Sequence, residues 1–170
     1  VVGVSWFEAE AYARCHNARL MDFFEREDIV RGPEKRRYPW GRDFKHGFAN
    51  TEESGFDKPS AVGLFTTDKT PDGIFDLAGN VAEWCRTAYD ESMYEYGYDM
   101  NTEYIYHALD HDPPSMKRKV IRGGSWKDIG YYLQTGTRTY EYQDTAKSYI
   151  GFRSVMNYLG RGGPNKEGDF

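Results

Sequence analysis

The first residues of the chain carry the pattern of a short amphipathic helix. Ser5 and Glu8 have the spacing of a capping box, in which the serine side chain accepts a hydrogen bond from the third helical residue and the glutamate reaches back. Apolar residues then recur at intervals of three and four, which puts them on one face of a helix. We therefore expect a helix over residues 6–17.

The same start signal predicts a second helix soon afterwards. Asp22 and Glu25 repeat the capping pattern. Gly32 and Pro33 then interrupt the run, because proline disfavours a helical conformation in the residue before it. The pattern predicts a helix that ends near Val30.

The rest of the chain shows no helical periodicity. Residues 36–71 are rich in Gly, Pro, Asn, Asp and Ser, which is typical of irregular structure. So long an irregular segment needs another source of order in a compact domain, and we expect aromatic side chains and a bound ion to supply it. Residues 119–122, 132–138 and 151–156 are the best strand candidates, and we expect them to form a small antiparallel sheet.

Size and charge limit the possible functions. A chain of 170 residues with 39% apolar and 16% aromatic content can bury one substantial core, so one domain is expected. Its 22 basic and 27 acidic residues give a net charge of −5, and no basic run could follow a phosphate backbone, so nucleic acid is not an expected partner. No apolar stretch approaches the roughly 20 residues of a membrane helix, so no transmembrane segment is expected.

Four short, turn-rich motifs follow one another along the chain: Tyr38-Pro-Trp-Gly41, Gly73-Ile-Phe-Asp-Leu-Ala-Gly-Asn-Val-Ala-Glu-Trp84, Arg122-Gly-Gly-Ser-Trp126 and Gly151-Phe-Arg153. Each motif is weak alone. In this order, behind the predicted first helix, they resemble the formylglycine-generating-enzyme/sulfatase-modifying family. The resemblance covers residues 2–155. It implies an α+β, C-type-lectin-like fold with two short helices, a small antiparallel sheet and much irregular loop structure.

The resemblance also sets the expected domain limits. The chain begins inside a recognisable motif, and the family places further strands and a targeting segment before this point. We therefore expect residues 1–160 to form one family domain whose N-terminal part is missing. Residues 161–170 are expected to be a flexible tail.

Active members of the family use two cysteines that bind copper and oxidise a substrate cysteine to formylglycine. These cysteines lie between the Arg-Gly-Gly-Ser motif and a shared arginine, here Arg138. The corresponding segment, residues 126–138, contains no cysteine, and thiolates are the soft ligands that select Cu(I). Cys15 and Cys85 map elsewhere; they could pair in an oxidising compartment or remain separate, buried thiols. We expect no catalytic residues and no enzyme activity.

An enzyme of another kind remains an alternative: a metal-dependent oxidase or sulfoxide synthase of the same family. His107 and His111 have a ligand-like spacing and would share a face on a helix. Pro113 and Pro114 follow at once and would end such a helix. We expect a solvated polar loop there.

The family resemblance implies a calcium site in the second motif. The side chains of Asp76 and Glu83 and the carbonyls of Gly79 and Val81 match the family's ligand positions, and calcium takes oxygen ligands of these kinds. Calcium is therefore the expected cofactor. Alternatively, the two carboxylates cap turns or pair with arginines.

A second family calcium site is expected to be weak. That site uses an asparagine, the following carbonyl and an Asp-Gly-Phe triplet. Here Asn50 and Thr51 are present, but the triplet begins with Ser54. Serine replaces a carboxylate, and the loss of one anionic ligand weakens calcium binding.

Tyrosines are unusually frequent between residues 86 and 119, and they suggest a contact surface, because amphipathic rings suit interfaces. The expected binding residues are rings of this segment and of the strand face after the third motif: Tyr94, Tyr96, Tyr98, Trp126, Tyr131 and Tyr140. The alternative is that these rings pack inward.

Residues 119–153 resemble, more specifically, the GldK/PorK-type lipoproteins of gliding motility and type IX secretion. That resemblance implies a non-catalytic, calcium-supported assembly module in an oligomeric complex of cell-envelope proteins. It also implies a periplasmic, outer-membrane-associated location, with a signal or lipid anchor in the missing N-terminal part. A display domain that binds variable ligands is a further alternative.

Overall fold

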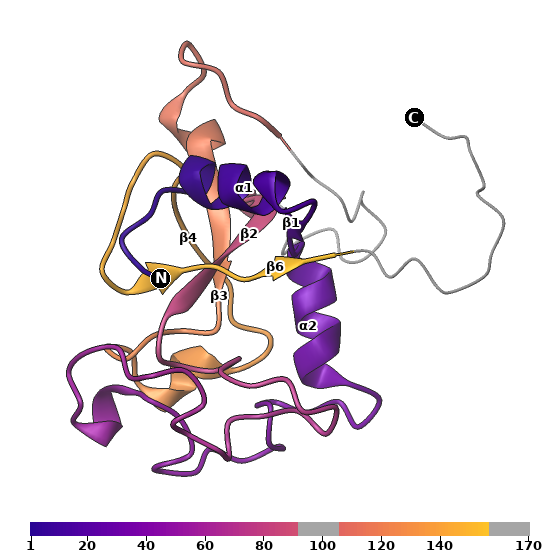
Figure 1. Ribbon diagram of the computed structural model, residues 1–170, viewed down its shortest axis with the longest axis vertical. Helices are drawn as coiled ribbons and strands as arrows, with labels where there is room; N and C mark the ends of the chain where they lie inside the picture. The colour runs from indigo at the N-terminus through magenta and orange to yellow at the C-terminus, as the bar shows by residue number, and fades with distance from the viewer. Residues whose placement is uncertain (92–105, 157–170) are drawn as a thin grey trace, which may run out of the picture.

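The computed structural model describes residues 1–91 and 106–156, with two helices and a small sheet above a body of loops (Figure 1). The helices are α1 (Trp6–Cys15) and α2 (Phe23–Arg31). The strands are β1 (Arg19–Leu20), β2 (Ala82–Ala88), β3 (Arg118–Arg122), β4 (Thr139–Tyr142), β5 (Ile150–Gly151) and β6 (Ser154–Val155). The short 3-10 helices are η1 (Glu52–Ser54), η4 (Pro114–Lys117) and η5 (Gly130–Leu133).

Both predicted helices are confirmed, together with their capping boxes. At α1, Ser5 Oγ accepts from the Glu8 N–H at 3.3 Å, and Glu8 Oε2 accepts from the Ser5 N–H at 2.7 Å. At α2, the corresponding bonds between Asp22 and Glu25 measure 2.8 and 3.0 Å. Each box satisfies backbone donors that the first helical turn leaves without a partner.

Neither helix has the length and apolar character of a membrane span, and the described residues contain no other candidate for one.

The main sheet has four strands in the order β4-β3-β2-β5, and β1 pairs with β6 in a second, two-stranded sheet. Strand β3 runs antiparallel to β2 and β4, whereas β2 and β5 are parallel. The predicted strand at 119–122 is confirmed as part of β3. The predicted strand at 151–156 is divided between β5 and β6, so it serves both sheets.

The prediction of a strand over residues 132–138 is wrong. This segment contains the end of η5 and a turn, and the strand of this region, β4, begins at Thr139. The buried side chain of Arg122 explains the difference, because its guanidinium donates to the carbonyls of Thr135 and Thr137. Carbonyls held by an arginine are not available to a strand ladder.

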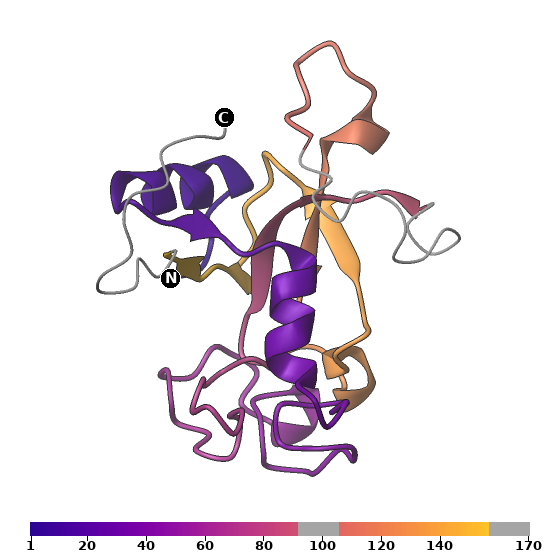
Figure 2. The ribbon, with the colours of Figure 1, turned by 90° about the vertical axis from the view of Figure 1, so that its right-hand side faces the viewer.

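Strand β2 was not predicted, although it lies at the centre of the sheet. Helix α1 covers one of its faces and α2 the other (Figure 2). Trp6 of α1 donates its Nε1–H to the Cys85 carbonyl at 2.8 Å, and the Phe23 N–H at the start of α2 donates to Thr87 Oγ1 at 3.1 Å. A strand buried on both faces shows no alternation of polar and apolar residues, which removes the usual strand signal.

The lower loops of the molecule, residues 36–71, are irregular apart from η1, as the sequence predicts (Figure 1). Aromatic side chains order part of this region. The Tyr38 and Trp40 rings stack with centroids 5.3 Å apart, and Phe44 packs beside them against the buried Leu133 of η5. The expected aromatic source of order is therefore confirmed.

Candidate binding face and the predicted cation sites

A pocket of about 220 Å³ opens beside β3 and β4, at the segment that follows the Arg-Gly-Gly-Ser motif. Three tyrosine rings line it: Tyr132, Tyr140 and Tyr149. Lys127 also lines it, with its Nζ 3.7 Å from the centroid of the Tyr149 ring. The pocket thus combines aromatic surface with a cationic group, the mixture of apolar walls and a few polar groups that is common in binding sites.

The two glycines of the motif shape the wall of this pocket. Both have positive φ, 95° at Gly123 and 68° at Gly124. A Cβ on Gly123 would lie 2.4 Å from Arg26 Nη2, and one on Gly124 would lie 2.7 Å from Leu133 Cδ1. Glycine is needed at both positions, because it alone adopts this backbone conformation at low cost and leaves the space.

Of the predicted binding residues, Tyr140 lines the pocket, and Trp126 and Tyr131 are each one position from a lining residue in the sequence. Tyr131 is 66% exposed and Tyr140 is 39% exposed, as a contact surface requires. The Tyr140 ring centroid lies 4.7 Å from that of Tyr89 and 4.7 Å from the guanidinium carbon of Arg118, so this ring also has a packing role. Trp126 is half-buried, and its Nε1 is buried without a hydrogen-bond partner. The other predicted rings, Tyr94, Tyr96 and Tyr98, lie outside the described residues.

The two cysteines are separate from this pocket and from each other. Both are free thiols; Cys15 is exposed on α1, and Cys85 is buried in β2. Burial raises the pKa of the Cys85 thiol to about 12, so this thiol stays protonated at neutral pH. A protonated thiol is neither a nucleophile nor a copper ligand.

Histidine does not supply a metal site in the described parts of the chain. His107 lies with its ring centroid 5.7 Å from that of Trp6, and the segment 106–113 forms no helix that would align it with His111. Within residues 1–91 and 106–156, no group of three or more His, Cys, Asp or Glu side chains is placed to hold a metal ion.

The predicted calcium ligand Glu83 lies at the start of β2 between two arginines. Arg26 of α2 donates from Nε to Glu83 Oε2 at 2.9 Å, and Arg153 donates from Nε to Glu83 Oε1 at 2.6 Å. The side chains of Arg26 and Glu83 are only 4% and 6% exposed. Burial alone would raise the pKa of the Glu83 carboxyl, but the charges of Arg153 and Arg26 outweigh burial and hold this pKa below its ordinary value.

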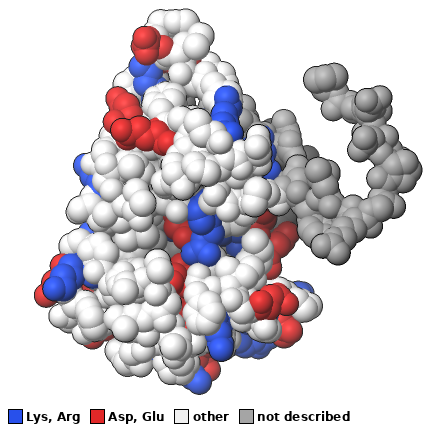
Figure 3. All heavy atoms as spheres, in the orientation of Figure 1, with Lys and Arg blue, Asp and Glu red and all other residues white. Residues whose placement is uncertain are grey.

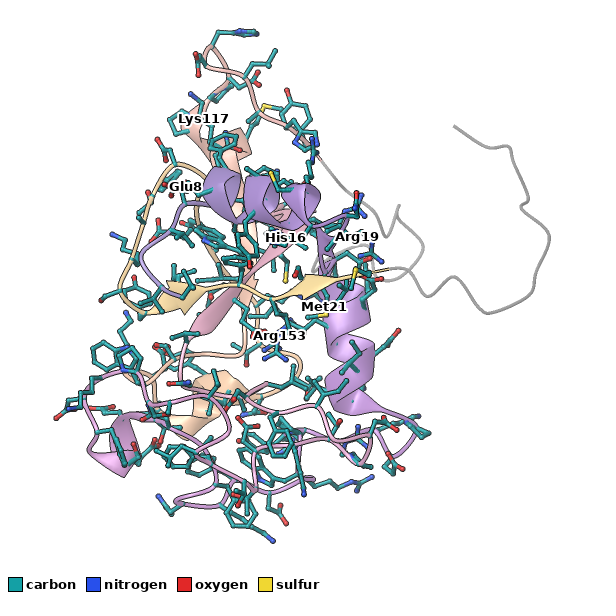
Figure 4. The ribbon with its side chains drawn as sticks, in the orientation of Figure 1. Glu8, His16, Arg19, Met21, Lys117 and Arg153 are labelled. Carbon is teal, nitrogen blue, oxygen red and sulfur yellow. The ribbon has the colours of Figure 1, made fainter. Side chains whose placement is uncertain are left out.

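The second predicted ligand, Asp76, lies next to the same arginine. Asp76 has a left-handed backbone with φ 56°, and its Oδ2 accepts from the Gly63 N–H at 2.7 Å. Its carbonyl accepts from Arg153 Nη2 at 2.7 Å, and the Phe75 carbonyl accepts from the same guanidinium at 3.2 Å. Figure 4 shows the Arg153 side chain between β6 and the lower loops, and Figure 3 shows basic and acidic side chains gathered in the hollow at that level.

The two predicted carbonyl ligands lie on the turn that leads into β2. Gly79 has φ 70°, and its N–H donates to the Gly123 carbonyl at 2.8 Å. A Cβ at Gly79 would lie 2.3 Å from the Asn50 carbonyl oxygen, so the turn requires glycine. Val81 is half-buried next to the first residue of β2. The structure therefore keeps the predicted residues on one turn and the strand start that follows it, but both carboxylate oxygens of Glu83 and one of Asp76 already accept from protein donors.

Asp68 is an acidic residue of this region that was not predicted from the sequence. It is buried, its Oδ2 accepts from the Ala78 N–H at 3.1 Å, and its Oδ1 has no hydrogen-bond partner. Burial raises the pKa of the Asp68 carboxyl to about 7. No sequence motif marks this residue, because its burial and its bond to Ala78 arise only when the chain folds back on itself.

The weaker predicted calcium site is filled by a side-chain hydroxyl. Ser54 Oγ lies 3.0 Å from Asn50 Oδ1 and 2.7 Å from the Thr51 carbonyl oxygen. These are the two oxygens that the family resemblance assigns to the ion. The Asn50 Nδ2 donates to Asn80 Oδ1 at 3.2 Å, which ties the same loop to the main turn.

With the geometry in place, comparison with known proteins identifies the domain. Residues 1–158 match the family model of the sulfatase-modifying factor enzyme 1-like domain. The chain belongs to this family. Membership confirms the resemblance drawn from the four ordered motifs, whereas the more specific likeness of residues 119–153 to GldK/PorK-type lipoproteins stays a prediction.

Relatives of this formylglycine-generating-enzyme-like (FGE-like) domain have different names. The chain is 31% identical over 170 residues to the serine/threonine-protein kinase Pkn1 of Chlamydia trachomatis, a match that covers 92% of the chain and 24% of that protein. It is 31% identical over 169 residues to inactive C-alpha-formylglycine-generating enzyme 2 of Bos taurus, covering 90% of the chain and 48% of that protein. The chain thus spans about a quarter of the length of the first relative and about half of the second.

Solved structures support the fold. PvdO from Pseudomonas aeruginosa superposes with a TM-score of 0.71 at 22% identity, covering 91% of this chain and 60% of that one. At this identity the likeness concerns the fold alone. Together with the helices and sheets described above, it confirms the α+β, C-type-lectin-like architecture.

Proposed function

We propose that this FGE-like domain is a non-catalytic binding or assembly module of a bacterial cell-envelope complex. We further propose that it contacts a protein partner through the pocket face, defined as Lys127, Tyr131, Tyr132, Tyr140 and Tyr149. A periplasmic, outer-membrane-associated location and membership of an oligomeric assembly are part of the proposal, and they rest on the resemblance of residues 119–153 to GldK/PorK-type lipoproteins.

One observation carries the non-catalytic part of the proposal. The segment 126–138, where active relatives place their copper-binding cysteines, borders the pocket but contains no thiol. The nearest cysteine in the sequence, Cys85, is buried in β2 with its thiol pKa raised to about 12. Copper-dependent oxidation needs soft thiolate ligands, which this site does not supply. The name of the bovine relative adds that the family contains a member called inactive.

The dimensions and chemistry of the face favour a protein partner over a large small-molecule ligand. Sites for drug-sized ligands usually occupy about 300–1,000 Å³, and this pocket measures about 220 Å³. It can receive one side chain of a partner. Exposed rings around it, such as Tyr131 and Tyr132, belong to the residue types that contribute most binding energy at protein interfaces.

The binding part is tested with a double variant, Lys127→Glu with Tyr131→Ser. The domain would be used as bait against a solubilised envelope fraction, and the captured partner would then be purified and titrated. We expect about 30-fold weaker binding, since one interface hot spot contributes about 2 kcal/mol, with an unchanged melting temperature. Tyr12→Ser is the matched control, because Tyr12 is 53% exposed on α1, away from the pocket lining. Equal loss in both variants would contradict the proposal.

The non-catalytic part is tested separately with the copper-loaded domain and a cysteine-containing sulfatase peptide. We expect no formylglycine product by mass spectrometry. Copper-dependent conversion of the peptide would show that the domain is an enzyme and would contradict the proposal.

A further inference from the structure

The predicted calcium positions are the part of this molecule where the family pattern and the contacts of this chain disagree. Every carboxylate oxygen of Glu83 has a guanidinium partner, at 2.9 Å from Arg26 and at 2.6 Å from Arg153. Both arginines carry a fixed positive charge at any physiological pH. A divalent cation at Glu83 would have to approach these two charges in a largely buried setting, where repulsion is weakly screened.

Arg153 also performs the structural task that a bound cation performs in such a turn. Its guanidinium gathers Glu83 Oε1 and the carbonyls of Phe75 and Asp76 around one positive centre. A calcium ion orders a loop in the same way, by collecting carboxylate and carbonyl oxygens. The planar fork of arginine fixes the directions of these bonds as well as their number.

Arg26 closes the opposite side of the turn. It reaches from α2 to Glu83 Oε2 and donates from Nη2 to the Leu77 carbonyl at 2.7 Å. The two guanidinium groups therefore hold the three consecutive carbonyls of residues 75–77 as well as the Glu83 carboxylate. Because Arg26 belongs to α2 and Arg153 to the segment between β5 and β6, the turn is fastened to α2 and to the segment that joins the two sheets.

At the second predicted calcium site, the group that contacts the expected ligands is neutral. Ser54 Oγ lies within hydrogen-bond distance of Asn50 Oδ1 and of the Thr51 carbonyl oxygen. The hydroxyl is therefore in contact with both oxygens that would otherwise face an ion. Serine thus lacks the anionic ligand and also engages the two oxygens that remain.

We infer that in this chain the guanidinium groups of Arg26 and Arg153 and the hydroxyl of Ser54 take the place of the two calcium ions that the family resemblance implies. The turn of residues 75–77 and the Asn50–Ser54 loop are then ordered by the protein's own donors, and folding of the domain does not depend on calcium. This inference is independent of the proposed partner-binding function, which concerns the pocket face.

The first test measures the melting temperature of the full chain after exhaustive dialysis against EGTA, and again with millimolar CaCl₂ or MgCl₂. Ligands that bind only the native state raise stability by mass action. We expect the three melting curves to coincide and calorimetric titration with CaCl₂ to show no stoichiometric binding. A melting temperature that falls by about 4 °C or more in EGTA and recovers with calcium but not magnesium would overturn the inference.

The second test creates the anionic ligand that the chain lacks. Ser54→Asp removes the hydroxyl and adds a carboxylate beside Asn50 Oδ1 and the Thr51 carbonyl, so we expect this variant to gain a calcium-dependent rise in melting temperature of about 4 °C or more. Ser54→Ala is the matched control; it removes the hydroxyl without adding charge and should gain no calcium response. If Ser54→Asp gains none either, the role assigned to the Ser54 hydroxyl is wrong.

A third variant tests the contacts of Arg153 directly. Arg153→Lys retains one positive charge but loses the fork, so it should lower the melting temperature, and added calcium should not restore it. Restoration by calcium would show that the turn is a cation site that the arginine only borders, and this result would overturn the inference.

Discussion

The upper and lower halves of this domain are held together by different means. Around the sheet, α1 and α2 bury large apolar side chains such as Trp6, Phe23 and Leu20. Burial of apolar area is not directional and tolerates small changes of geometry. In the lower half, order comes from directed polar bonds that tie the turn of residues 75–77 to Glu83 through its arginines, and from a few stacked rings in the lower loops. A region built on directed bonds loses more stability when one partner is removed, because the other partner is left unsatisfied.

The largest effect is expected from Glu83→Gln. This change removes the charge between Arg26 and Arg153 and leaves the buried guanidinium of Arg26 and the partly exposed one of Arg153 without their common carboxylate. Removal of one partner from a buried ion pair usually costs about 3–5 kcal/mol. The free energy of unfolding, measured with urea, should fall by that amount.

An exposed ion pair provides the comparison. Arg14 pairs with Glu10 on α1, and the Arg14 side chain is 66% exposed. Arg14→Gln should cost no more than about 1 kcal/mol. If the two variants lose similar free energies, the Glu83 cluster is not the anchor of the lower loops.

A smaller effect concerns pH and the buried Asp68. Burial raises the pKa of its carboxyl from 3.8 in the unfolded chain to about 7 in the fold, so the folded state favours the protonated form. The stability from this group is fully present below pH 3.8 and is lost as the pH rises through about 7, with a slope of at most about 1.4 kcal/mol per pH unit. Asp68→Asn should remove this slope and leave the variant relatively more stable at pH 8 than at pH 5.

The control for this pH series is Asp72→Asn, a change at an exposed aspartate of the same loop region. It should leave the pH dependence of the free energy of unfolding as it is in the unmodified chain. A parallel slope in the Asp68 variant would mean that this carboxyl titrates normally and is not held neutral by the fold.

The smallest stability effect is expected at a local contact of the upper half. Ser5→Ala removes the side-chain acceptor of the α1 capping box and should cost about 1 kcal/mol. Thermal melting of the variant measures this loss, and Ser5→Asp, which keeps an acceptor, should recover most of it. A loss near that of Glu83→Gln would show that the first helix, rather than the polar cluster, limits stability.

Features that depend on neighbouring residues were predictable from the sequence. The capping boxes at Ser5 and Asp22 specify where both helices begin, because their donors and acceptors lie three residues apart. Strand β3 has a short apolar run of its own. The family followed from the order of four motifs, and the missing cysteines of residues 126–138 are visible without any structure.

Only the tertiary structure decided the rest, because the decisive partners are far apart along the chain. Strand β2 is buried on both faces by helices that precede it by more than fifty residues, so its own sequence shows no strand period. The same distance separates Glu83 from its arginines, 57 positions to Arg26 and 70 to Arg153. The sequence by itself determined that oxygen ligands gather at Asp76 and Glu83. Whether a cation or two guanidinium groups face them depends on which side chains the fold brings there, and no local pattern encodes that choice.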